Sequence, residues 1–195
     1  MIRRAGSSIV KVAVLRYADG PGVTYEVYVE AIPSRVWELV TDIHLPARLS
    51  PELQRVEWLD DTNGLAKGAS FLGYNSHPRI GEWRTASYVT ELDQERVFGW
   101  VVTDVDGAFA GPDGAGRADV SSPAATWRFE LEPEGAGTRL RQTAQVGPGR
   151  SGLSLVIDQA PEHEEQIVES RLGQLRSHIE SVLDGIKALA ENRTP

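Results

Sequence analysis

The sequence contains no cysteine, no run of lysine or arginine, and no long uninterrupted apolar segment. Without cysteine the chain has no disulfide framework, no thiolate metal site and no cysteine nucleophile. Its 20 basic residues are outnumbered by 28 acidic ones, and the net charge of −8 argues against binding to nucleic acid or anionic membranes. No segment approaches the roughly 18 apolar residues that a membrane-spanning helix needs. These absences predict a cytoplasmic globular protein that does not insert into membranes.

Motifs for metals, phosphates and serine hydrolysis are also missing. The four histidines (His44, His77, His163 and His178) are scattered along the chain, and none forms part of a zinc-binding helix motif. The glycine-rich segment 111–116 has the wrong glycine spacing for a phosphate loop. In segment 149–153 (GRSGL), Leu153 stands where a nucleophile elbow around Ser151 needs its second glycine. We therefore expect no metal and no cofactor.

The last third of the chain has the spacing of one long amphipathic helix over residues 160–192. Its apolar residues recur in alternating steps of four and three, at Val168, Leu172, Leu175, Ile179, Val182, Ile186 and Leu189. This spacing keeps all of them on one stripe of a helix. A helix of roughly 30 residues is about 45 Å long, so its stripe needs a large partner surface.

The preceding segments read as strands, which predicts an α+β domain with a mainly antiparallel sheet. Strands are expected at 24–31, 53–59, 70–76, 82–92, 96–103, 125–132 and 138–146, with a short helix starting at Pro33. Residues 104–123 read as a long loop, and residues 153–159 have no clear pattern. We expect a single domain over 23–192, preceded by a loosely attached leader at 1–22.

Strand alternation predicts which side chains face the helix. The more apolar parity contains Trp83, Trp100 and Trp127, and it also contains the polar residues Thr85, Ser87 and Gln142, while Phe71 and Asn75 compete with Leu72 and Tyr74 on their strand. Polar groups in a dry core need hydrogen-bond partners, whereas a ligand-filled cavity removes that requirement. The alternative is that the tryptophans are ordinary core residues. This parity holds no Asp, Glu, His or Lys, which argues against strong acid–base catalysis deep in a pocket.

Several segments resemble the START-like (SRPBCC) superfamily, the polyketide cyclase/dehydrase and lipid-transport group. They are 32–42 (IPSRVWELVTD), 68–71 (GASF), Trp83 to Val89, Phe98 to Trp100, Trp127 to Leu131, 137–139 and the long C-terminal helix. The resemblance implies a helix-grip (Bet v 1-like) fold: a seven-stranded antiparallel sheet wrapped around the C-terminal helix, with two short helices after the first strand. It also implies a cavity for a hydrophobic lipid- or polyketide-like molecule. The basic leader and the long 104–123 segment depart from the group.

The resemblance leaves the activity open between a polyketide cyclase or aromatase and a non-catalytic lipid or metabolite carrier. If the chain is catalytic, His77 and Glu82 are candidates for an acid–base pair at the cavity mouth, with Tyr74 beside them; a solvated turn is the alternative. The candidate ligand-binding residues are Phe71, Asn75, Trp83, Thr85, Ser87, Trp100, Trp127, Gln142, Leu172 and Leu175. A third hypothesis is an interaction protein whose long helix forms a coiled coil, and the sequence leaves a homodimer open.

Overall fold

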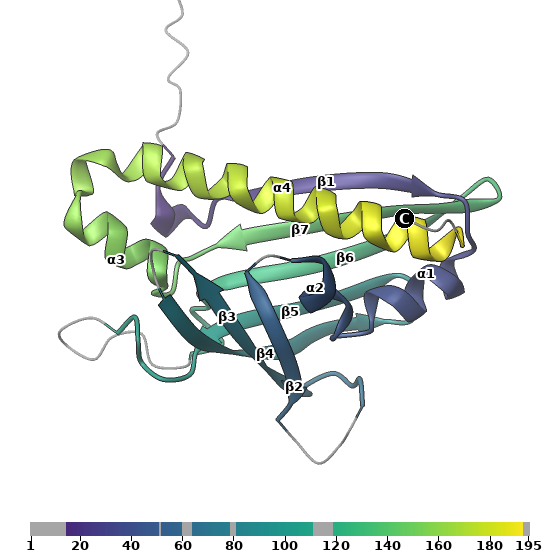
Figure 1. Cartoon of the computed structure of the whole chain (residues 1–195), viewed down its shortest axis with the longest axis horizontal. Coiled ribbons are helices and arrows are strands. Elements are labelled where there is room, and N and C mark those ends of the chain that lie inside the picture. The colour runs from purple at the N-terminus through teal and green to yellow at the C-terminus, as the bar shows by residue number, and fades with distance from the viewer. Residues whose placement is uncertain (1–14, 51, 60–63, 79–80, 111–118, 193–195) are drawn as a thin grey trace, which may run out of the picture.

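The computed structural model describes residues 15–50, 52–59, 64–78, 81–110 and 119–192, and in this part of the chain a seven-stranded antiparallel sheet forms the centre (Figure 1). Its strands are β1 (Gly22–Val29), β2 (Leu53–Trp58), β3 (Ser70–His77), β4 (Gly81–Asp93), β5 (Val97–Asp104), β6 (Ala125–Glu134) and β7 (Gly137–Val146). The strand order is β1-β7-β6-β5-β4-β3-β2. Strands β2 to β7 therefore form a meander, and β1 closes the other edge beside β7.

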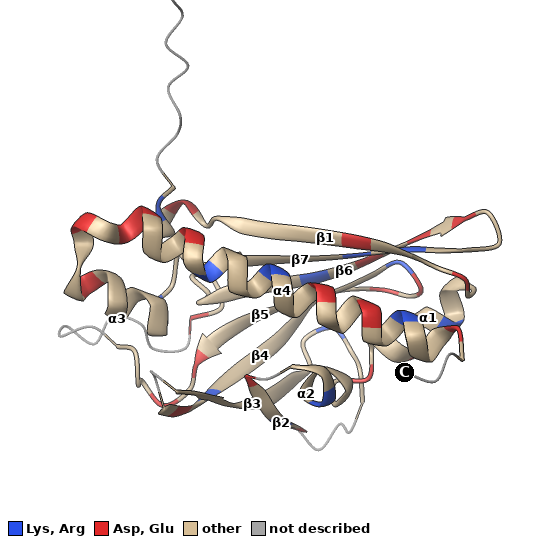
Figure 2. Ribbon diagram, turned by 45° about the horizontal axis from the view of Figure 1, so that its top comes forward, with Lys and Arg blue, Asp and Glu red and all other residues tan. Residues whose placement is uncertain are grey.

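Helices occupy one face of this sheet. They are η1 (Tyr17–Asp19), α1 (Pro33–Val40), α2 (Leu45–Leu49), α3 (Gly152–Gln159), η2 (Pro161–His163) and α4 (Glu164–Ala190). The long helix expected at 160–192 is α4 with a 3-10 turn in front of it. Figure 2 shows acidic residues at the start of α4, where negative charge favours the helix dipole. None of the described helices has both the length and the apolar character that crossing a membrane requires.

Segment 153–159, which has no clear pattern in the sequence, forms α3. Ser151 caps its first turn, because the Ser151 hydroxyl accepts the Leu153 N–H at 3.2 Å and the Ser154 hydroxyl accepts the Ser151 N–H at 3.0 Å. This reciprocal cap satisfies two donors that the helix start leaves open. The start of α3 is therefore fixed by this local cap, and the sequence of α3 has no clear hydrophobic periodicity that would have predicted it.

The stripe of α4 faces the sheet, which confirms the helix-grip architecture. The buried residues of α4 are Val168, Leu175, Ile179, Val182, Leu183, Ile186 and Ala190. Leu189, which the spacing placed on the stripe, is 39% exposed, and Ala190 takes the inward position of the last turn. Because the helix packs this stripe into its own domain, the stripe is not available for an intermolecular coiled coil.

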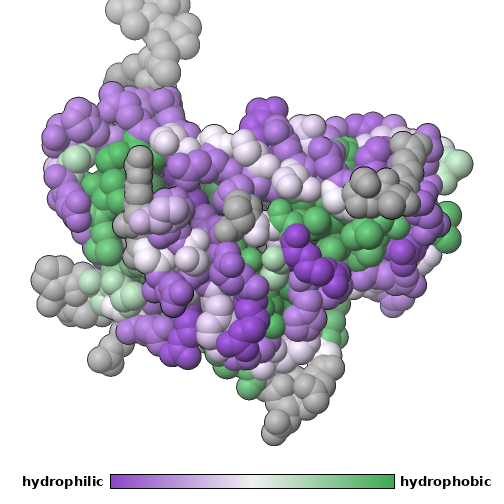
Figure 3. Space-filling view, in the orientation of Figure 1, coloured by the Kyte–Doolittle hydropathy of each residue, from purple (hydrophilic) through white to green (hydrophobic). Residues whose placement is uncertain are grey.

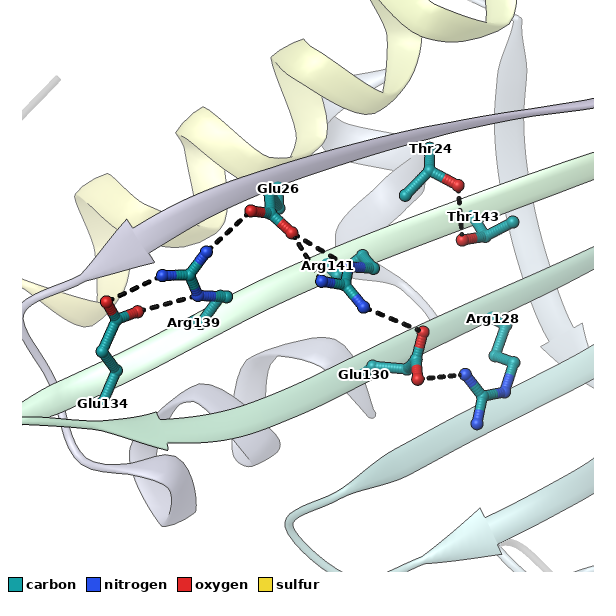
Figure 4. A network of polar contacts seen from close by, with 8 residues as sticks. All are labelled: Thr24, Glu26, Arg128, Glu130, Glu134, Arg139, Arg141 and Thr143. Atoms are coloured by element: carbon teal, nitrogen blue, oxygen red, sulfur yellow. Dashed lines mark hydrogen bonds and ion pairs between the residues drawn. The ribbon is translucent and has the colours of Figure 1, made fainter.

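The outer face of the sheet carries a network of ion pairs (Figure 4). Glu26 accepts hydrogen bonds from Arg139 and Arg141, and the carboxylate of Glu134 lies 2.8 Å from Arg139. Bonds from Arg141 and then Arg139 hold the pKa of Glu26 below its ordinary value. These side chains come from neighbouring antiparallel strands, so opposite charges alternate across the ladder.

The end of the predicted leader is anchored to the domain. Tyr17 is buried, and its hydroxyl donates to the carbonyl of Gly149 at 2.6 Å. Its backbone N–H donates to the carboxylate of Glu164 at 2.9 Å. Residues 1–14 of the leader lie outside the described part of the chain.

Candidate functional site

A cavity of about 520 Å³ lies between the inner face of the sheet and the helices. Strands β2 to β7, helices α3 and α4 and the segment after β5 all contribute side chains to it. Val156 of α3 lines the cavity and is also 44% exposed, so the cavity reaches the surface beside this helix. Figure 3 shows hydrophobic surface where α3 lies. This side of the cavity therefore borders exposed surface.

Aromatic rings form the sheet side of the cavity. Trp100 and Trp127 stack with ring centroids 6.3 Å apart and an interplanar angle of 11°. Phe71 lies against Trp100 at 6.2 Å, and Phe109 lies edge-on to Trp83 at the same distance. Flat rings of this kind bind planar or apolar molecules and leave room for a few polar groups to set the orientation.

Phe109 comes from the segment after β5 that the sequence predicted as a long loop. Its N–H donates to the carboxylate of Asp104 at 2.7 Å, and its carbonyl accepts from Arg150 at 2.8 Å. These two bonds hold the buried Phe109 ring at the cavity. Residues 111–118 of this loop lie outside the described part of the chain.

Neutral polar groups interrupt the aromatic wall. Asn75 donates to the hydroxyl of Thr85 at 3.3 Å, and Ser87 is buried beside Phe71 on the paired strand. Gln142 is only 4% exposed, and its side-chain oxygen accepts no hydrogen bond from any described residue. A buried acceptor without a donor is unfavourable, so a ligand that brings a donor would be stabilised here.

An ion pair lies inside the cavity, contrary to the expectation of an inner surface without ionisable residues. The guanidinium of Arg171 in α4 donates to both carboxylate oxygens of Glu52 at 2.9 and 3.0 Å. Two histidines, His77 and His178, also line the cavity. This set joins the β2–β3 edge of the sheet to the N-terminal part of α4.

The charges of this set influence one another. Burial acts to raise the pKa of Glu52, but the hydrogen bonds and positive charge of Arg171 leave it below its ordinary value of 4.5. Burial lowers the pKa of His178 below 6.5; Glu52 opposes this effect, while Arg171 and His77 add to it. At neutral pH, His178 is therefore an uncharged imidazole beside a charged pair.

Sequence reasoning missed these residues for two reasons. Arg171, Gln174 and His178 recur in steps of three and four beside the apolar stripe, where polar residues ordinarily face solvent, yet they line the cavity. Glu52 precedes β2, where a register shift between Leu53 and Arg55 disrupts strict alternation. The i, i+3, i+7 spacing of these three polar residues, which puts them on one side of α4, was the signal that could have identified them.

The structure places the predicted ligand-binding residues along the cavity, except for one. The cavity-lining residues are Phe71, Asn75, Trp83, Thr85, Ser87, Trp100, Trp127, Gln142 and Leu175. Leu172 instead packs beside Tyr17, Val168 and Val146. Ligand binding by all ten residues remains a prediction.

The three candidate catalytic residues are not brought together. His77 lines the cavity, whereas Glu82 is exposed and is not among the lining residues. Tyr74 lies on the outer face, where its hydroxyl donates to Glu57 and the guanidinium of Arg55 lies over its ring. The strand ambiguity is thus resolved in favour of Phe71, Gly73 and Asn75 as the inward residues. Among the described residues, no group of three or more His, Asp or Glu is placed to hold a metal ion.

Comparison with known proteins identifies the family. Residues 21–191 match the family model described as polyketide cyclase / dehydrase and lipid transport. No curated protein matches the sequence significantly.

Solved structures share the fold. The chain is similar to a polyketide-cyclase-like protein from Corynebacterium glutamicum, with 27% identity, a TM-score of 0.56, and coverage of 87% of this chain and 91% of that one. It also resembles the Zhui aromatase/cyclase from a Streptomyces species, with 17% identity, a TM-score of 0.58, and coverage of 89% and 94%. The di-domain aromatase/cyclase StfQ from the steffimycin biosynthetic pathway is 13% identical with a TM-score of 0.62; 88% of this chain matches 51% of StfQ. The chain therefore belongs to the polyketide cyclase/dehydrase and lipid transport family.

Proposed function

We propose that this protein binds a hydrophobic, lipid- or polyketide-like small molecule in the cavity between the sheet and α4. The observation that carries the proposal is the cavity of about 520 Å³ with stacked tryptophans on its sheet side. This volume lies within the range of roughly 300–1,000 Å³ that is typical of small-molecule sites. Membership of the family supports the same role.

A cavity-filling variant tests binding. Thr85 lines the cavity, so Thr85→Trp should fill part of it and abolish saturable binding of the neutral fluorophore Nile red. The matched control is Thr143→Trp, because Thr143 lies on the outer face, where it pairs with Thr24 (Figure 4). Equal binding by both variants, or no saturable binding by the unmodified protein, would contradict the proposal.

A second candidate function is cyclase- or dehydrase-type catalysis, which the uncharged His178 near Glu52 favours. In an intramolecular aldol reaction, His178 would accept the proton from the carbon next to one carbonyl of the ligand. That carbon would attack a second carbonyl, and the protonated imidazole would return the proton to the new alkoxide. Loss of the resulting hydroxyl together with a second proton from the attacking carbon would release water and form a carbon–carbon double bond.

Turnover of a linear triketone separates the enzyme from the carrier. His178→Ala and His77→Ala should each slow ring formation without abolishing Nile red binding. Tyr74→Phe and Glu82→Gln are controls, because neither residue lines the cavity. A rate no faster than in buffer leaves the non-catalytic carrier as the function.

We also propose that the protein acts in the cytoplasm and has no nucleic-acid partner, consistent with the net charge of −8. A homodimer is a separate prediction. Light scattering during size-exclusion chromatography tests it, with a molecular mass near 21.3 kDa indicating a monomer.

A further inference from the structure

The cavity contains one strongly basic side chain. Among the described residues that line it, Arg171 is the single lysine or arginine. An arginine in an apolar cavity would ordinarily attract the carboxylate of a bound molecule, because the guanidinium matches a carboxylate with two parallel hydrogen bonds. In this protein Glu52 already occupies that position.

The carboxylate of Glu52 is placed to neutralise the charge of the Arg171 guanidinium. Glu52 receives both donors, and the side chains of Arg171 and Glu52 are only 25% and 15% exposed. Gln174 accepts a further bond from Arg171 at 3.4 Å. With an uncharged His178 next to it, this part of the cavity presents hydrogen-bonding groups and little net charge.

A ligand carboxylate would have to displace Glu52 or lie beside it. Displacement leaves the Glu52 carboxylate half-buried without its cation, and close approach places two negative charges side by side. A neutral ligand of the same shape meets neither penalty. The Asp104 carboxylate also lines the cavity and adds no positive charge.

We propose that Glu52 is a specificity-determining residue: it occupies the guanidinium of Arg171 and makes the cavity reject carboxylate-bearing ligands in favour of uncharged ones. This inference rests on the proposed binding function of the cavity. It predicts that removing either charge of the pair changes which ligand charge the cavity accepts. A purely structural ion pair would lower the affinity for all ligands alike when it is broken.

Matched probes test the inference by displacing Nile red at neutral pH. Naphthol is uncharged there, naphthoate is anionic, and the two share one ring system. The unmodified protein should bind naphthol about ten-fold more tightly or better. Glu52→Gln is nearly isosteric; it should strengthen naphthoate binding by at least about ten-fold and change naphthol binding by less than about three-fold.

Two further variants complete the test. Glu57→Gln makes the same change in the adjoining strand β2 but on the outer face, and it should leave the ratio of the two affinities unchanged. Arg171→Gln leaves Glu52 without its cation, so the cavity should gain affinity for naphthylmethylamine, which is cationic at neutral pH. This variant decides the question if Glu52→Gln does not fold.

The outcomes are distinct. A naphthoate preference in the unmodified protein, an unchanged ratio in Glu52→Gln, or no gain for the cationic amine in Arg171→Gln would each overturn the inference. Absence of Nile red binding to the unmodified protein would instead refute the proposed function. Inversion of the charge preference in either variant supports the inference.

Discussion

The two ends of α4 have different surroundings. From Ile179 to Ala190 the helix packs into the main core, where Ile179, Leu183 and Ile186 are at most 1% exposed. Its N-terminal part instead holds Arg171, Gln174 and His178 at the cavity. Figure 1 shows the C-terminal part close to α1 and the N-terminal part close to α3.

The difference shows how one helix both holds the domain together and leaves space for a ligand. At the C-terminal end, α1 and α2 fill the space between helix and sheet; Gly185 lets Leu49 approach so closely that an added Cβ would lie 2.8 Å from its methyl groups. Toward the N-terminal end, Val168 and Leu175 pack with Tyr17 and Val146 in a smaller cluster. The polar side chains of Arg171, Gln174 and His178 face the cavity there. The last turns of α4 serve packing, whereas Leu175, Ile179 and Val182 are buried and also border the cavity.

The largest expected effect concerns core truncation at the two ends. Ile186→Ala should lower the free energy of unfolding by about 4 kcal/mol, because it creates a void in packed surroundings. Leu175→Ala should cost only about 2 kcal/mol, because that side chain already borders open space. Urea unfolding measures both, and equal losses would remove the energetic distinction between the two ends.

Breaking the ion pair between Arg171 and Glu52 should have the next largest effect on the free energy of unfolding. Arg171→Met should lower the free energy of unfolding by about 2 kcal/mol, because it leaves Glu52 partly buried and uncompensated. Arg128→Met removes an arginine of the outer face that pairs with Glu130 and Glu91, and it should cost less than about 1 kcal/mol because water screens that pair. A loss at Arg128 that matches the loss at Arg171 would contradict the account.

Replacing the two glycines of α4 by alanine should change the free energy of unfolding by smaller amounts, and only one of the two replacements should raise it. No atom lies within 4 Å of a Cβ added to Gly173, so Gly173→Ala should raise the free energy of unfolding by about 0.5–1 kcal/mol. Gly185→Ala should give no such gain, because the new methyl group meets Leu49. Thermal unfolding of the two variants, run side by side, checks the sign.

The smallest expected effect concerns how the free energy of unfolding depends on pH. The pKa of His178 in the folded protein is below 6.5, so the unfolded chain takes up its proton first, and stability falls as pH drops below 6.5. Glu52 (next to β2), Arg171 (α4) and His77 (β3) face this imidazole. The stabilisation from Glu52 is present above 4.5 and is lost at lower pH, outside this window. Urea unfolding between these two values should show a shallower slope for His178→Gln, and an unchanged slope would exclude His178 as the cause.

Much of the fold follows from sequence patterns. The α4 spacing and strand alternation predicted the sheet, the long helix and most of the aromatic wall, because a burial pattern repeats over many residues. The ionisable set was not predictable in this way. Glu52 is brought to Arg171 by a contact across 119 residues and by an irregular strand start, neither of which leaves a periodic trace. The face that carries Tyr74 was left open because both parities of β3 carry large side chains.

The most direct test of the central claim uses a protein in which Trp37 and Trp58 are replaced by phenylalanine, since neither lines the cavity. The remaining tryptophans are Trp83, Trp100 and Trp127, all of which line it. A brominated naphthol quenches indole fluorescence on contact. We expect saturable quenching of most of this fluorescence, with the quenched fraction larger than in the unmodified protein. Quenching that does not saturate, or that disappears with the removal of Trp37 and Trp58, would contradict the claim that the ligand binds between the sheet and α4.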